Sequence, residues 1–119
     1  MSAGTLYTFI GSGNSYKIRL LEALLGIQLK HEELDFLADE QHQSKFLKIN
    51  PRGEVPCLVD GDKTFADSSS ILTWLAGKWA DGGKKEGPSS YWSNDLYEQA
   101  QIIDWVSCRR AECFTNASR

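Results

Sequence analysis

Residues 50–61 read NPRGEVPCLVDG, and residues 64–72 continue with TFADSSSIL. A glycine turn lies between two prolines, a short apolar run leads into an Asp-Gly hairpin turn, and an Asp-Ser pair then opens a helical pattern. This order gathers loop donors and the unpaired N–H groups of a helix start around one place. The segment therefore predicts a ligand-binding edge built from a turn, a hairpin and a helix N-terminus.

Pro56 stands directly before the apolar run CLV. Because proline cannot donate to a sheet ladder, we expect it at the start of a strand, either as an ordinary edge-strand proline or after a cis peptide bond. The cis form is the rarer of the two for X-Pro bonds in general. A cis bond would turn the N–H and C=O of Val55 outward, where they could pair with an extended, peptide-like ligand.

Hydrophobic periodicity predicts further elements on both sides of this segment. The first helix should take Asn14 or Ser15 as its N-cap, bury a stripe that Leu20 and Leu24 widen, and end before Gly26. The stretch 39–49 is expected to be a short, partly irregular helix. The other expected elements are strands at 5–10, 28–36, 57–59 and 64–66, and helices at 16–25, from Asp67 to Gly82, and at 92–108.

The composition is that of one ordinary globular domain, with 119 residues, 41% hydrophobic and 24% charged. A net charge of −3 offers no basic field, which disfavours nucleic acid as a partner. The apolar runs are too short to span a bilayer and the start has no signal-peptide pattern, so we expect no membrane partner and a cytoplasmic location.

Cysteine and histidine usage disfavours several kinds of chemistry. Cys57, Cys108 and Cys113 form no Cys-x-x-Cys pair, which argues against a disulfide framework and against dithiol redox chemistry. The two histidines lack the spacing of a metal site, so no metal ligands are predicted.

The sequence from Asn50 to Leu72 resembles the glutathione-binding half of proteins of the glutathione transferase family. The recurring family pattern is Asn-Pro-x-Gly-x-Val-Pro-x-Leu-x-Asp-Gly, followed by a Glu/Asp-Ser pair and a helix, and every element is present. The resemblance extends back to Leu6 and forward to about Trp105. It implies an α/β, thioredoxin-like domain in βαβ-ββα order, a mixed four-stranded sheet, a cis proline, and glutathione as substrate with no separate cofactor.

The resemblance also implies a domain organisation. We expect a glutathione-binding domain at residues 1–81, a linker at 82–90, and the truncated start of a helical second domain at 91–119. In the family an all-helical second domain follows the first, and we expect most of that domain to be missing from this sequence.

A residue that stabilises the glutathione thiolate is expected in the loop before the first helix. A hydroxyl there can donate a hydrogen bond, while the helix N-terminus adds a favourable potential. In serine-type transferases this hydroxyl lies about five residues before a basic-aliphatic pair, and counting back from Lys17-Ile18 leads to Ser12. In asparagine-type members the residue that binds the thiolate is an asparagine at the position of Asn14. Ser15 also lies at the start of the helix. Turn and cap chemistry alone would explain the same residues.

The resemblance also implies that three further segments bind the remaining parts of glutathione. Asp67 and Ser68 match the pair that holds the γ-glutamyl end, where a carboxylate meets the ligand ammonium and helix-start donors meet its carboxylate. Residues 54–56, Glu54, Val55 and Pro56, would hold the cysteinyl backbone. Gln41 and His42 occupy the positions that meet the glycine carboxylate, although Gln41 departs from the basic residue that the family often uses.

Two functions follow from the sequence. The first is a serine- or asparagine-type glutathione transferase that activates the thiolate toward an electrophile. The second is a non-catalytic, transferase-like interaction module that contacts another protein or a second copy of itself. The first hypothesis is weakened by the missing second domain, which in the family supplies most of the electrophile pocket.

Overall fold

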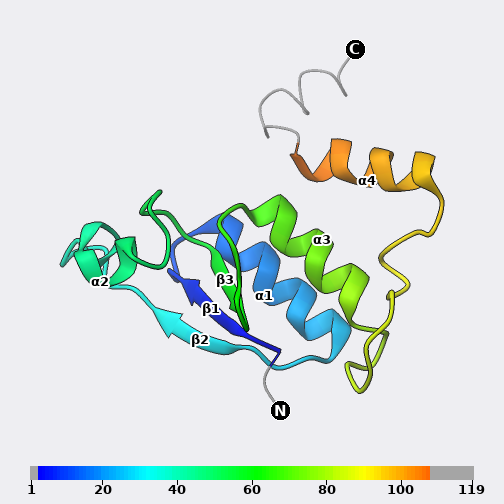
Figure 1. Ribbon diagram of the computed structural model, residues 1–119, viewed down its shortest axis with the longest axis horizontal. Helices are drawn as coiled ribbons and strands as arrows, with labels where there is room; N and C mark the ends of the chain where they lie inside the picture. Colours follow the sequence, from blue (N-terminus) through cyan, green and yellow to red (C-terminus); the bar gives the residue numbers. More distant parts are fainter. Residues whose placement is uncertain (1–2, 108–119) are drawn as a thin grey trace.

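Four strands form one mixed sheet in the computed structural model, which describes residues 3–107 (Figure 1). The strand order is β2-β1-β3-β4, with β1 parallel to β2 and antiparallel to β3, and β3 antiparallel to β4. This arrangement confirms the predicted βαβ-ββα order and places the second strand at an edge of the sheet. The strands are β1 Thr5–Thr8, β2 Lys30–Glu33, β3 Cys57–Asp60 and β4 Lys63–Phe65.

Helices α1 and α3 lie side by side and contact each other (Figure 1). The predicted short helix after β2 is a single 3-10 turn, η1, followed by one turn of α-helix, α2, so its irregular character is confirmed. Helix α4 contacts α3. The bounds are α1 Gly13–Leu25, η1 Glu40–His42, α2 Ser44–Leu47, α3 Ser68–Lys78 and α4 Leu96–Ser107.

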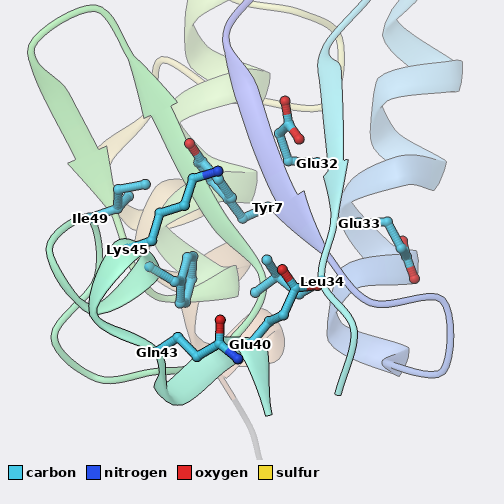
Figure 2. Close-up of a pocket in the computed structure, with 9 residues that line it drawn as sticks. Tyr7, Glu32, Glu33, Leu34, Glu40, Gln43, Lys45 and Ile49 are labelled. Carbon is cyan, nitrogen blue, oxygen red and sulfur yellow. The ribbon is translucent and has the colours of Figure 1, made fainter. Parts of the chain in front are cut away.

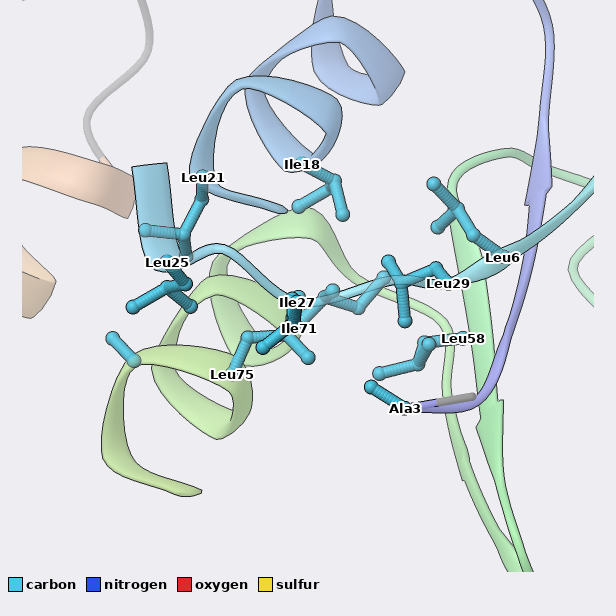
Figure 3. Close-up of a cluster of buried hydrophobic side chains, with 11 residues drawn as sticks. Ala3, Leu6, Ile18, Leu21, Leu25, Ile27, Leu29, Leu58, Ile71 and Leu75 are labelled. Atoms are coloured by element: carbon cyan, nitrogen blue, oxygen red, sulfur yellow. The ribbon is translucent and has the colours of Figure 1, made fainter. Parts of the chain in front are cut away.

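The main core lies between the sheet and the helix pair α1 and α3 (Figure 3). Leu6 and Leu58 come from adjacent strands and Ile18 from α1, and all three are fully buried. Burial of each such side chain contributes about 1.5–3 kcal/mol to stability. A second, smaller cluster of Leu34, Phe46 and Cys57 fixes α2 to the rest of the fold.

The first strand is shorter and the first helix longer than the sequence predicted. β1 ends at Thr8 because the chain turns there: Ser12 N–H donates to Phe9 O at 2.9 Å. The helix then begins at Gly13, and its N-cap is Ser12 rather than Asn14 or Ser15.

The buried stripe of α1 is narrower than predicted. Leu20 and Leu24 are 48% and 53% exposed, because the buried face of the helix consists of Ser15, Ile18, Leu21 and Leu25. The predicted stop is correct, since Gly26 ends the helix with a φ of +74°.

The segment between α3 and α4 is irregular but tied to the end of α3. Ser89 donates both its N–H and its hydroxyl to Ala76 O, at 2.9 and 2.8 Å. Helix α4 begins at Leu96 instead of near residue 92, and its predicted end at Cys108 lies outside the described residues. Within residues 3–107 no helix has the length and hydropathy to cross a bilayer.

Candidate functional site

Four connecting segments meet at one end of the sheet. The register pairs Tyr7 with Cys57 and Leu58 with Phe65, so the end of β1, the start of β3 and the end of β4 lie together. Because β2 runs parallel to β1, the segment that follows β2 also leaves at this end. The structure thus brings together the loop before α1, the segment leading to η1, the Val55–Pro56 peptide and the start of α3, which are the four segments that the family resemblance assigns to glutathione.

The loop before α1 presents one hydroxyl at the helix N-terminus. Ser12 Oγ accepts a hydrogen bond from Ser15 N–H at 3.1 Å, which leaves its own proton free to be donated to a ligand. Ser12 is partly exposed and Asn14 is exposed, whereas Ser15 is fully buried and its Oγ has no hydrogen-bond partner among residues 3–107. Among the three candidates in this loop, the serine hydroxyl open to solvent is therefore that of Ser12.

The start of α3 combines a carboxylate with helix-start donors. Asp67 is the N-cap, and its Oδ2 accepts hydrogen bonds from Ser69 N–H at 3.1 Å and Ser70 N–H at 3.3 Å. Its Oδ1 has no hydrogen bond to any described residue, so half of the carboxylate is available. Ser68 occupies the first turn, where the N–H groups and the helix dipole favour an anion.

The turn at residues 50–56 presents a peptide edge. The Val55–Pro56 bond is cis, as the family resemblance implied. Neither the N–H nor the C=O of Val55 is hydrogen-bonded to another residue in the described part of the chain. Glu54 is exposed, but its main-chain oxygen is held by the buried side chain of Asn50, whose Nδ2 donates to it at 2.9 Å.

The η1 segment packs directly on this turn. Gly53 has a φ of +64°, and a Cβ placed on it would lie 3.0 Å from Gln41 O and 3.1 Å from His42 Cδ2. The exposed His42 ring lies against Asp39, with 2.7 Å between Nδ1 and Oδ1. The side-chain oxygen of Gln41 is buried and has no hydrogen-bond partner in the part of the chain that the structure describes. The contact with Gly53 places both residues of η1 beside the turn that carries Glu54.

Cys57 begins β3 beside this site but is fully buried. Burial raises the pKa of its thiol to about 11, so the protonated form dominates at neutral pH. A thiol in that state is a poor nucleophile, so Cys57 is a residue of the core.

A separate cavity of about 170 Å³ lies between α2 and strands β1 and β2, and no sequence pattern pointed to it (Figure 2). Lys45 and the carboxylates of Glu32 and Glu40 line it together with the ring of Tyr7. The sequence also gave no role to Asn50, although a polar residue before proline at the end of a helical pattern is a signal for a buried turn anchor.

Comparison with known proteins places this fold in one family. Residues 2–77 match the family model described as the N-terminal domain of glutathione S-transferase. Protein URE2 of Candida albicans is 34% identical over 105 residues, and a zeta-class glutathione S-transferase of Euphorbia esula is 38% identical over 76 residues. These matches cover 86% and 64% of this chain and 30% and 34% of the two relatives.

Solved structures agree with this assignment. Ure2p in complex with glutathione aligns with a TM-score of 0.75 at 28% identity over 88% of this chain and 47% of that one. A glutathione transferase homologue of Drosophila mojavensis, also with bound glutathione, aligns with a TM-score of 0.73 at 30% identity over 87% of this chain and 45% of that one. The chain thus spans less than half the length of these relatives, and by its matched domain it belongs to the glutathione S-transferase family.

Proposed function

We propose that this chain binds glutathione at the sheet end where the four segments meet, and that Ser12 stabilises the ligand as a thiolate. The observation that carries the proposal is the convergence of a free peptide edge at Val55 with the two helix N-termini capped by Ser12 and Asp67. The two related structures with bound glutathione support the choice of ligand.

Each end of the tripeptide has a complementary partner. The free oxygen of Asp67 takes the γ-glutamyl ammonium, and the hydroxyl of Ser68 with the first-turn N–H groups takes the neighbouring carboxylate. The N–H and C=O of Val55 pair with the cysteinyl backbone, which leads the thiol toward the β1–α1 loop. Gln41 and His42 meet the glycine carboxylate.

Ser12 is the proposed thiolate partner because its hydroxyl is partly exposed while that of Ser15 is buried. A donated hydrogen bond and the α1 dipole both favour the anion over the neutral thiol. Asn14 is the alternative, because its exposed side-chain amide can also donate.

The proposed reaction is attack of this thiolate on an electrophile, with glutathione as substrate and no separate cofactor. In domain terms we propose residues 1–81 as the glutathione-binding unit, 82–90 as a linker and 91–119 as the beginning of a helical segment. The cytoplasmic location of the protein remains an expectation from the sequence alone.

One observation favours the second candidate, an interaction module. Helix α4 exposes large apolar side chains: Leu96 is 80%, Tyr97 70% and Trp105 72% exposed. Large apolar side chains left exposed on one helix are compatible with contact with another polypeptide, either a second copy or a different protein. Such a role is compatible with glutathione binding and does not require catalysis.

Calorimetric titration with glutathione tests the proposal. Asp67→Asn is the informative variant, because asparagine caps a helix as well as aspartate does but carries no charge for the ligand ammonium. We expect saturable binding by the wild type and an affinity lower by about 10- to 100-fold in D67N, the usual range for losing a charged hydrogen bond. No saturable heat with millimolar glutathione would refute the binding proposal.

A further inference from the structure

The β1–α1 loop, residues 9–12, is fastened to the end of strand β2. The main-chain ladder between β1 and β2 ends where Leu34 N–H donates to Thr8 O at 2.9 Å. Beyond that point the Ile10 N–H donates to the side-chain Oε1 of Glu33 at 2.6 Å. Among the described residues, this is the one hydrogen bond that joins the loop to another strand.

An aromatic pair adds a second attachment of the loop to the segment after β2. The rings of Phe9 and Phe36 stack with 4.3 Å between centroids and 7° between planes. The loop folds closely over the ring of Phe9, since a Cβ on Gly11 would lie only 2.7 Å from Phe9 Cε2. The position of the Ser12 N-cap therefore depends on contacts with Glu33 and Phe36.

The Glu33 carboxylate is directed at this one loop amide. In Figure 2 its side chain lies on the opposite side of β2 from that of Glu32, where β1 leads into α1. Glu32 pairs with Lys30 at 3.2 Å, whereas Glu33 has no ion pair with any described cation. An ionised acceptor forms a stronger bond to an N–H group than a neutral one.

We propose that Glu33 is a positioning residue for Ser12, holding the β1–α1 loop through Ile10 N–H so that the Ser12 hydroxyl points at the bound thiol. This inference rests on the proposed function of Ser12. Glu33 does not touch the ligand in this account, and it acts through the loop alone.

Glu33 would have two opposing effects on the ionisation of the bound thiol. The hydrogen bond orders the loop and so favours the thiolate, while the negative charge of Glu33 by itself disfavours a second anion nearby. Glu33→Gln keeps a carbonyl acceptor and removes the charge, whereas Glu33→Ala removes both. Glu33 is exposed, so neither change disturbs the core. Glu32→Ala is the matched control, because it removes the same charge from the neighbouring residue.

Two measurements on the full chain test the inference. The first is hydrogen exchange of the Ile10 amide by NMR without ligand, and the second is the pH titration of bound glutathione followed by the ultraviolet absorbance of its thiolate. In E33A we expect faster Ile10 exchange and a thiol titration about one pH unit higher, which is about a tenfold loss of thiolate at neutral pH. In E33Q, Ile10 stays protected and the titration lies at or below that of the wild type, and E32A changes neither.

The outcomes distinguish this inference from the proposed function. If the wild type binds and ionises glutathione and E33A does so equally well, the positioning role is wrong while the proposed function stands. An E33Q profile that coincides with that of E33A also contradicts the positioning role. If the wild type does not ionise bound glutathione, the function of Ser12 fails and the role of Glu33 fails with it.

Discussion

The side-chain amide of Asn50 donates a hydrogen bond to the main-chain oxygen of Glu54, with 2.9 Å between nitrogen and oxygen. The same side chain accepts a bond from Arg52 N–H at 3.1 Å, and it is only 1% exposed. One buried residue thus fixes both sides of the turn that leads to Val55. The peptide edge that we propose to bind glutathione is thus held in place by the buried side chain of Asn50.

Asn50→Ala should lower the free energy of unfolding by about 1–3 kcal/mol, because it removes both hydrogen bonds that the buried Asn50 side chain makes, to Glu54 O and from Arg52 N–H. Glutathione affinity should fall as well, since Val55 loses its fixed position. Denaturant unfolding and calorimetric titration measure the two effects. The exposed Asn94 provides the control, and an N50A unfolding midpoint equal to that of N94A would contradict the anchor role.

Gly53 and Gly61 form a matched pair for testing the contact with η1. Both have positive φ, +64° and +61°, so alanine at either position costs about 1–2 kcal/mol in backbone conformation. Only at Gly53 would the new Cβ meet η1, at 3.0 Å from Gln41 O, whereas at Gly61 it meets no atom within 4 Å. We expect G53A to lose more stability than G61A and to bind glutathione more weakly. Equal glutathione affinity in the two variants would show that the η1 contact does not matter for binding.

Asp60 should make stability depend on pH in the acidic range. Burial opposes ionisation of its carboxylate, but hydrogen bonds from Lys78 and Trp74, with the charges of Lys78 and Lys63, outweigh burial and lower its pKa. A lowered pKa stabilises the folded state above the unfolded-state value of about 3.9, and this contribution is lost as the pH falls through the folded-state pKa.

Asp60→Asn should therefore be less stable than the wild type at neutral pH and lose less stability on acidification. Chemical unfolding at several pH values between about 6 and 3 measures how the free energy of unfolding of each protein changes with pH. Parallel curves for the two proteins would mean that the Lys78 pair, at 2.7 Å, contributes no pH dependence.

Cys57 should resist alkylation in the native protein. Its thiol is fully buried and its pKa is raised to about 11, so almost no thiolate exists near neutral pH. Mass spectrometry that locates the label by residue should find Cys57 modified only after unfolding. Rapid labelling of Cys57 in the folded protein would contradict its place in the core.

The sequence predicted those features that local chemistry determines. The Asp60-Gly61 turn and the Gly26 helix stop each follow from residue types at fixed offsets, and the structure shows both. The cis bond at Pro56 came from the family resemblance, because X-Pro chemistry alone favours the trans form.

The predictions were wrong where contacts between residues far apart in the sequence determine the structure. Ser12, Asn14 and Ser15 can all cap a helix, and the choice among them depends on a loop held by Glu33, 23 residues from Ile10. Leu20 is apolar and close to the buried stripe, yet its burial depends on which side of α1 meets α3. Local propensity does not contain that information.

The pH titration of bound glutathione in the wild type and in Ser12→Ala tests the central claim most directly. Ultraviolet absorbance of the thiolate should show bound glutathione ionising below the value of about 8.5 that is typical of a free thiol. The S12A complex should still form, but its thiol should titrate near the free value. The claim would be contradicted by identical titrations in the two proteins, or by loss of the shift in Asn14→Ala while S12A retains it.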